Sequence, residues 1–337
     1  MIKTPLFWYD KSFFSRLKTY LLSPLSIMWI IASRIKIILS HPYKSRLKVI
    51  CIGNITIGGT GKTPFAISVF NLLKNMGFNP AFLTRGYGGK NHGPLEVKAH
   101  HNHLDIGDEA LLLGNIGTTI VSKNRSSGAK LIEGDDRNFD VIIMDDGLQN
   151  NQLHKDMNIL LIDKNKIFGN EYCIPAGPLR QTISYGIKKI NTIILTGNNE
   201  ENIDLNYKIM KEIPVFNSKI IVENLPKIKQ RNFFAFCGLA NPSKFYMTLE
   251  ENKLNVIKQK SFPDHHKYTN EDISTLVKEA KKEKLQLITT EKDYVKINGK
   301  NKNLINVLSI NINLTDTDKN KFKSFLRDII NDGSSNL

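Results

Sequence analysis

The chain has 337 residues, of which 41% are hydrophobic and 23% are charged. This composition is typical of a folded protein and excludes a disordered chain, and the length suffices for two compact domains. The basic residues exceed the acidic ones by 47 to 32, and the net charge of +15 favours anionic partners. Because no RNA-binding motif, zinc-ligand spacing or basic-aromatic stripe accompanies this charge, we expect no nucleic-acid partner. Three scattered cysteines in apolar surroundings are typical of buried, reduced thiols.

Residues 1–46 form a basic and apolar N-terminal region. The segment 21–39 is strongly apolar, but Arg34 and Lys36 interrupt it, so it suits an interfacial helix better than a spanning segment of roughly 18 or more residues. Tryptophans and many flanking cations favour an amphipathic helix at an anionic membrane surface. A signal peptide is not expected, since the cations follow the apolar run. A helix that merely packs on the core remains the alternative.

The segment 47–74 reads LKVICIGNITIGGTGKTPFAISVFNLLK and predicts a buried strand, a glycine-rich turn and a helix. This order and the Gly-Lys-Thr sequence are typical of a P-loop, in which backbone N–H groups and a lysine hold nucleotide phosphates. Thr56 stands where the strict pattern has its first glycine. A chance Gly-Lys-Thr at an ordinary turn is the alternative. The predicted nucleotide-binding residues are Ile57, Gly58, Gly59, Thr60, Gly61, Lys62, Thr63 and Pro64.

Further along the chain, strands are predicted at 80–84 and 118–121 and a helix at 125–133. The glycine cluster 85–89 follows the first of these strands, at the edge where open α/β sheets bind ligands. The acids of Gly107-Asp108-Glu109 open a short apolar segment. Acids are favourable at the N-terminal end of a helix, where they complement its dipole. This purely structural role therefore remains an alternative to a functional one.

The run 140–149 predicts a buried strand that ends in Asp145 and Asp146. A carboxylate at a strand tip can hold Mg²⁺ opposite the P-loop Thr63, although a plain Asp-Asp-Gly turn is the alternative. Either aspartate can fill this role. After another buried strand at 158–163, a Gly- and Pro-rich loop ends in Arg180, whose guanidinium suits a phosphoryl group or an anionic substrate.

We place a core domain at 47–212, a hinge at 213–230 and a second α/β domain at 231–337. Alternating strands and helices imply two doubly wound parallel-sheet units. The expected elements of the second unit are strands at 232–237, 285–289 and near 305–310, and helices at 243–251, from 271 and after 315. The paired His265 and His266 allow a metal ligand, an acid–base group or solvated side chains, and metal has little support without a third ligand.

Taken together, these motifs resemble the tetraacyldisaccharide 4′-kinase family of lipid A biosynthesis. The resemblance covers nearly the whole chain and includes GNITIGGTGKTP, LTRGYGG, GDEALLL, DDGLQ, IPAGPLR, FCGLANP, FPDHH and TTEKDYVK. The family's P-loop normally lacks the first glycine, which accounts for Thr56. Two departures are Asn150, where the family commonly has histidine, and Gln181, where it commonly has an acid.

The resemblance implies an α/β P-loop kinase with a second, smaller domain, which uses ATP and Mg²⁺. The acceptor it implies is the 4′-hydroxyl of an acylated glucosamine disaccharide 1-phosphate. Asp108 paired with His265 would accept the hydroxyl proton when the domains close. We choose His265 over His266 because it directly follows Asp264, as in the family pattern. The expected catalytic residues are Asp108, His265, Lys62 and Arg180, the metal ligands are Thr63 with Asp145 or Asp146, and the substrate-binding residues are Arg85, Tyr87, Gly88, Glu109, Arg125 and Gln149.

The resemblance also implies a location at the cytoplasmic face of the inner membrane of a Gram-negative bacterium, held there peripherally. An anionic membrane surface is then a partner, and no obligate protein partner is expected. Two other functions stay open. A P-loop transferase with a soluble acceptor would not need the apolar N-terminus. A P-loop NTPase switch would hydrolyse ATP without any lipid acceptor.

Overall fold

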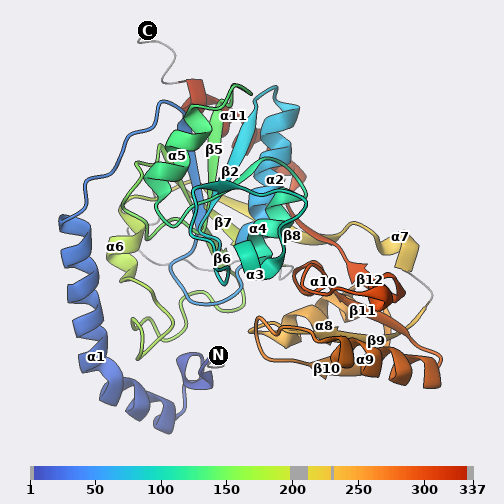
Figure 1. Ribbon diagram of the computed structural model, residues 1–337. Coiled ribbons are helices and arrows are strands. Elements are labelled where there is room, and N and C mark those ends of the chain that lie inside the picture. Colours follow the sequence, from blue (N-terminus) through green and yellow to red (C-terminus); the bar gives the residue numbers. More distant parts are fainter. Residues whose placement is uncertain (1–3, 198–211, 229–230, 332–337) are drawn as a thin grey trace.

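The computed structural model describes residues 4–197, 212–228 and 231–331 (Figure 1). Its larger domain is built on a nine-stranded sheet whose seven inner strands run parallel, with an antiparallel strand at each edge. The first domain is thus a mixed sheet, where a purely parallel one was expected. In spatial order its strands are β13 (Ile310–Leu314), β8 (Val215–Val222), β7 (Thr192–Thr196), β6 (Met157–Asp163), β1 (Lys48–Gly53), β5 (Val141–Asp145), β2 (Pro80–Thr84), β4 (Thr119–Val121) and β3 (Leu95–Glu96).

Helices cover both faces of this sheet, because side chains along a buried strand alternate between the faces. On β1, Ile50 and Ile52 face the cluster that contains α2 and α11, whereas Val49 and Cys51 face α5. Burying both faces explains why the inner strands read as continuous apolar runs. The helices of this domain are η1 (Leu6–Trp8), α1 (Phe13–Ile38), α2 (Lys62–Asn75), α3 (His103–Ile106), α4 (Asp108–Gly114), α5 (Arg125–Glu133), α6 (Ile183–Ile187) and α11 (Asp316–Asn331).

The smaller domain lies beside the larger one and contains a four-stranded parallel sheet (Figure 1). Its clusters include three fully buried phenylalanines on one strand, which pack against helices on the two faces. The elements are α7 (Leu225–Ile228), α8 (Pro242–Glu251), α9 (Asn270–Lys282), α10 (Glu291–Tyr294), η3 (Lys300–Leu304), β9 (Asn232–Cys237), β10 (Asn255–Ser261), β11 (Gln286–Thr290) and β12 (Ile305–Leu308), with the sheet order β10-β9-β11-β12.

The domain boundaries differ from the expected ones at both ends of the smaller domain. The segment 213–230, expected as a hinge, contains β8, which pairs with β7 and β13 in the large sheet. The segment near 305–310, expected as one strand, is two strands in different sheets, separated by Ser309. A short apolar run shows that a segment is extended, but it does not show which sheet it joins. Parts of the expected ranges, at 1–3, 198–211, 229–230 and 332–337, lie outside the described residues.

The chain therefore crosses between the domains twice and returns to the first domain for β13 and α11. The two crossings are tied together, since the Glu223 N–H donates to the Ser309 carbonyl at 3.0 Å. The Asn224 side chain adds a bond to the Val307 carbonyl at 2.6 Å. On α11, Phe322 is fully buried against Phe65 and Phe216. Truncating such a side chain typically costs about 3–5 kcal/mol, so α11 belongs to the core of the first domain.

Helix α1 begins eight residues before the expected apolar segment and runs for 26 residues along one side of the large domain (Figure 1). Ser12 caps it by accepting a hydrogen bond from the Ser15 N–H at 3.4 Å. By length and composition it is the one helix in the described part of the chain that is long and apolar enough to cross a membrane. Because α1 is longer than the expected apolar segment, its length no longer favours an interfacial helix over a membrane-spanning one.

The orientation of α1 is the reverse of that of a core helix. Its buried residues are Ser15, Thr19 and Ser26. The Ser26 hydroxyl donates to the Cys173 carbonyl at 2.7 Å, and the Trp29 indole donates to the Arg180 carbonyl at 2.9 Å. The exposed side chains are mostly large and apolar: Phe13, Phe14, Leu17, Tyr20, Leu21, Leu25, Ile27, Met28, Trp29, Ile31, Ile35 and Ile38. So many exposed apolar side chains on one helix are typical of an interaction site.

Candidate active site

The P-loop lies between β1 and α2, as predicted. Gly61 is the N-cap of α2 with φ of 85°, and a β-carbon there would lie 2.2 Å from Ile312 Cδ1, so the position requires glycine. Asn54 braces the loop from within. Its side-chain amide donates to Thr60 Oγ1 at 3.1 Å, and its oxygen accepts from Lys62 Nζ at 3.4 Å. The residues expected to hold phosphates, 57–64, thus comprise the loop up to the N-cap Gly61 and the first three residues of α2.

Asp145 and Asp146 lie at the tip of β5, but their side chains have different partners. The Thr63 hydroxyl donates to Asp145 Oδ2 at 2.9 Å. Asp145 Oδ1 is buried and has no hydrogen-bond partner within the described part of the chain. Burial first, and then the negative charges of Glu109 and Asp146, raise the pKa of Asp145 to about 7. The positive charge of Lys62 and the hydrogen bond from Thr63 oppose this rise but do not cancel it.

Asp146 is instead paired with cations. Its carboxylate lies 2.9 Å from Arg180 Nη1 and 3.7 Å from Lys62 Nζ. Burial opposes ionisation, but the charges of Lys62 and Arg180 outweigh it and lower the pKa of Asp146. Gln149 joins this group, because its amide donates to the Asn54 carbonyl at 2.8 Å and its oxygen accepts from Arg180 at 3.3 Å. The structure therefore brings four predicted residues together at one edge of the P-loop.

Asp108 and His265 come from different domains and are in contact. His265 Nδ1 lies 3.1 Å from Asp108 Oδ2, and the Asp108 side chain is only 4% exposed. Burial alone would raise the pKa of Asp108, but the hydrogen bond with His265 and the positive charge of Lys292 lower it to about 2. Asp108 is therefore a carboxylate at neutral pH. Asp108 also opens α4, so a charge at its N-terminus is favourable in either role.

His266, left open beside His265, has another partner. Its Nε2 lies 3.0 Å from Asp272 Oδ2, and its ring stacks on Phe262, so it is held within the smaller domain. His265 has φ of 55°, a left-handed conformation that is uncommon for residues other than glycine, and its imidazole reaches Asp108 across the interface. Of the two histidines, the geometry therefore selects His265 as the partner of Asp108.

The other predicted substrate residues are more dispersed. Tyr87 is 52% exposed, and its ring centroid lies 5.5 Å from that of His265. Arg85 is exposed, and Gly88 forms the adjoining turn with φ of 82°. Arg125 is buried at the start of α5, where its guanidinium donates to the Ser122 carbonyl. Desolvation first, and then the charge of Arg85, lower the pKa of Arg125 to about 10. Arg125 is therefore buried, whereas Arg85 and Tyr87 are exposed.

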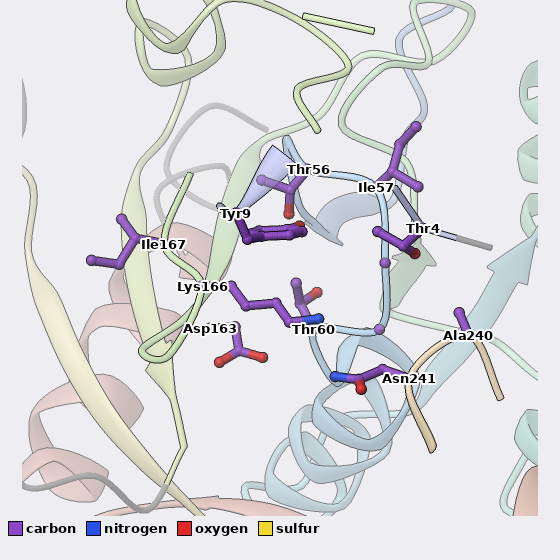
Figure 2. A pocket seen from close by; sticks show the side chains of 12 residues that line it. Thr4, Tyr9, Thr56, Ile57, Thr60, Asp163, Lys166, Ile167, Ala240 and Asn241 are labelled. Carbon is purple, nitrogen blue, oxygen red and sulfur yellow. The ribbon is translucent and has the colours of Figure 1, made fainter. Parts of the chain in front are cut away.

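A second group at the site was not singled out from the sequence. Asp163 ends β6, next to β1, and its carboxylate lies 3.0 Å from Lys244 Nζ of α8 in the smaller domain. Figure 2 shows Lys166 extending from the segment after β6 toward Thr60, with Asn241 nearby. Together with Tyr9 and residues 56–60, they line a hollow beside the P-loop. The sequence contained a pattern that could have identified Asp163, because it ends a buried strand just as Asp145 does.

Lys292 is the remaining unassigned residue of the site. Its Nζ lies 3.2 Å from Glu109 Oε1 and 3.9 Å from Asp108 Oδ2, so it joins the acids of α4 from across the domain interface. Burial would lower the pKa of Lys292, but Glu109 and Asp108 raise it above its ordinary range. The segment TTEKDYVK, which contains Lys292, was noted in the sequence but received no role.

Comparisons with known proteins agree with this geometry. A family model described as tetraacyldisaccharide-1-P 4′-kinase matches residues 18–331. A tetraacyldisaccharide 4′-kinase of Rickettsia typhi is 37% identical over 316 residues, which cover 93% of this chain and 95% of that protein. One of Parvibaculum lavamentivorans is 39% identical over 300 residues, covering 88% and 87%.

A solved structure is similar over nearly its whole length. The crystal structure of LpxK from Aquifex aeolicus in complex with ATP superposes with a TM-score of 0.74 and 25% sequence identity, covering 93% of this chain and 99% of that one. The family match and the curated relatives each span most of the chain, so they apply to both domains. The chain therefore belongs to the tetraacyldisaccharide-1-P 4′-kinase family, and it is a kinase.

Proposed function

We propose that this kinase transfers the γ-phosphoryl group of ATP to the 4′-hydroxyl of tetraacyldisaccharide 1-phosphate in lipid A biosynthesis. The observation that carries the proposal is the contact of 3.1 Å between Asp108 and His265 across the domain interface. A hydroxyl acceptor needs a proton acceptor beside it, and a nucleotide switch has no use for an acid–histidine pair shared between two domains.

ATP would bind with its phosphates over the P-loop. The backbone of residues 58–61 and the N-terminus of α2 supply donors, and Lys62 supplies a positive charge. Arg180 stands on the other side of Asp146, from which it can move to the transferred phosphoryl group. The hollow lined by Asp163, Lys166 and Asn241 adjoins the loop, and we expect the rest of the nucleotide to extend to that side. The ATP seen in the Aquifex aeolicus structure supports this assignment.

The residues around Thr63 fit a magnesium ion. The unpartnered Oδ1 of Asp145 and the Thr63 hydroxyl are hard oxygen ligands of the kind Mg²⁺ prefers. Among the described residues no cluster of three or more His, Cys, Asp or Glu side chains forms a metal site of its own. The ion would therefore rely on nucleotide phosphates for further ligands, as Mg²⁺ commonly does. When bound, it would neutralise charge on the β- and γ-phosphates.

Asp108 would act as the base in the transfer. It is ionised at neutral pH, and His265 orients its carboxylate from the second domain. The acceptor oxygen would form a bond to the γ-phosphorus as the bond to the β–γ bridging oxygen breaks, and the hydroxyl proton would pass to Asp108. Since His265 belongs to the second domain, the pair is complete only when the domains are together. This arrangement would limit ATP hydrolysis when the site is open.

The location we propose is the cytoplasmic face of the inner membrane of a Gram-negative bacterium. Helix α1 buries serine and threonine and exposes its large apolar side chains, as expected for a surface that contacts acyl chains. Its anchoring contacts reach Cys173 and Arg180, in the loop that leads to the P-loop edge. A membrane-bound headgroup would thereby be held near the phosphoryl donor, and the basic flanks of α1 would attract an anionic surface.

The deciding experiment is transfer of radioactive γ-phosphate from ATP to detergent-dispersed tetraacyldisaccharide 1-phosphate, with a control that lacks the lipid. We expect labelled lipid from the wild type and its loss in Lys62→Ala. Release of inorganic phosphate without labelled lipid would favour an NTPase switch. Labelling of a water-soluble acceptor in preference to the lipid would favour a soluble-substrate transferase.

A further inference from the structure

The short helix α10 lies at the domain interface, and two neighbouring residues on it point in opposite directions. Lys292 points out of the smaller domain toward the acids of α4, and Asp293 points inward and is fully buried. Helix α10 thus contacts Asp108 through Lys292, and through Asp293 it contacts Gly238, which in turn bonds to the backbone of His265.

Asp293 organises the interior of the smaller domain beneath His265. Its carboxylate accepts from the Gly238 N–H at 3.0 Å and from the Thr290 hydroxyl at 2.8 Å. It also forms an ion pair with Lys296 at 2.7 Å. The Gly238 carbonyl in turn accepts from the His265 N–H at 3.2 Å. The backbone that carries His265 is therefore connected to Asp293 through one glycine.

Lys292 organises the other half of the pair. Its Nζ contacts Glu109 at 3.2 Å and lies 3.9 Å from Asp108, and its side chain is 23% exposed. The Glu109 N–H donates to Asp108 Oδ1 at 3.1 Å, so a cation that holds Glu109 also limits the movement of Asp108. A flexible lysine is held in place here by two carboxylates, and its positive charge helps to lower the pKa of Asp108.

We propose that α10 assembles the Asp108–His265 pair, with Lys292 as a positioning residue for the α4 acids and Asp293 as the anchor of the His265 loop. The inference rests on the role of Asp108 under the proposed function. Under this proposal, docking of the two domains also orients the base Asp108, because α10 positions both Asp108 and His265. Lys292 acts through Asp108 and Glu109 and need not contact the substrate.

The first test compares Lys292→Met, which removes the charge and keeps the length, with Lys292→Arg and with the control Lys278→Met, exposed on α9 of the same domain. We expect Lys292→Met to lower kcat about tenfold to a hundredfold, part of the roughly 10²–10⁴ that a general base contributes. The KM for ATP should stay within about twofold, and Lys292→Arg should recover most of kcat, since only a positioning charge is needed. A kcat of Lys292→Met equal to that of Lys278→Met would overturn the proposal.

The second test places Lys292→Met in an Asp108→Asn background. If Lys292 acts through Asp108, the double variant is no slower than Asp108→Asn alone, because residues that work as a unit are not additive. An equal loss in both backgrounds would show that Lys292 acts elsewhere, and the proposal would fail while the base assignment stood.

Hydrogen exchange separates failure of this inference from failure of the proposed function. We expect faster exchange of the α4 amides in Lys292→Met, and of the amides at 262–266 in Asp293→Asn, relative to Lys278→Met. If Asp108→Asn keeps its activity but this exchange increases, the base assignment fails and the docking role of α10 stands. Unchanged exchange in both variants would overturn the docking role.

Discussion

His265 contacts Asp108 at 3.1 Å although 157 residues separate them in the sequence. The contact joins a loop of the smaller domain to the N-terminus of α4 in the larger one. Both residues are shielded from solvent, with side-chain exposures of 17% and 4%. The predictions below follow from this pair, from the neighbouring P-loop and from the exposed face of α1.

The Asp108→Ala variant should lower kcat by about two orders of magnitude or more, because under the proposed function the acceptor hydroxyl would lose its base. The KM for ATP should remain near that of the wild type, since Asp108 lies on α4 and not on the P-loop. The measurement is steady-state transfer of phosphate to the lipid. Asp136→Ala, at an exposed acid of the same domain, serves as the control. Activity of Asp108→Ala within a few-fold of this control would remove Asp108 from the mechanism.

Under the proposed function, the response of activity to Mg²⁺ should depend on Asp145 more than on Asp146. Asp145→Asn removes the negative charge beside the Thr63 hydroxyl, whereas Asp146 is already neutralised by Lys62 and Arg180. We expect a titration of activity with Mg²⁺ at fixed ATP to shift to concentrations about tenfold or more higher in Asp145→Asn, the cost of a weakened metal ligand. Chelation with EDTA should abolish transfer in both variants. A larger shift in Asp146→Asn would reverse the assignment of the ligand.

The free energy of unfolding should depend on pH, because the pKa of Asp108 is lowered in the folded state. A carboxyl with a pKa of about 2 in the folded state and an ordinary value when unfolded contributes about 2 kcal/mol at pH 7. Since the folded pKa is lowered, this contribution is present above the unfolded pKa of about 4 and is lost as the pH falls toward 2.

Urea unfolding of the wild type and Asp108→Asn checks this dependence. The difference between their free energies of unfolding should be largest at pH 7 and distinctly smaller at pH 3. The same comparison for Asp136→Asn should show little difference at either pH. A wild-type advantage of the same size at both pH values would mean that Asp108 stabilises the fold by contacts unrelated to its charge.

Vesicle binding should depend on the apolar face of α1. Phe14, Leu21 and Met28 are 73%, 71% and 66% exposed, and they are spaced by seven residues along the helix. The triple change of these residues to glutamate should release the protein from vesicles that contain anionic phospholipid, because it places charges where acyl chains would pack.

Deletion of residues 1–40 should have the same effect on vesicle binding, but it also removes contacts to Cys173 and Arg180. The substitutions are therefore the sharper test. Met247→Glu with Ile257→Glu is the matched control, since these residues are 51% and 56% exposed on the smaller domain. Sedimentation of the triple variant with vesicles to the same extent as the control would place the membrane contact elsewhere.

Much of the local structure was predictable because it is encoded over a few residues. The strand at 80–84 and the helix at 125–133 have the predicted bounds. The strand, turn and helix of the P-loop follow from an apolar run, glycines and an amphipathic segment in immediate succession. The tip of β5 was also predictable, since a buried strand that ends in two aspartates is a local pattern.

The tertiary structure alone decided how these pieces share sheets and partners. Nothing in the sequence of β8 indicates that it pairs with β13, almost a hundred residues away, because hydrogen bonds between strands use backbone groups that every residue has. The same holds for Lys292 and Asp293, whose opposite directions arise from the turn of α10 and the position of α4. The local sequence pattern thus determined the secondary-structure elements and the candidate site residues. Long-range packing determined which of those residues are in contact.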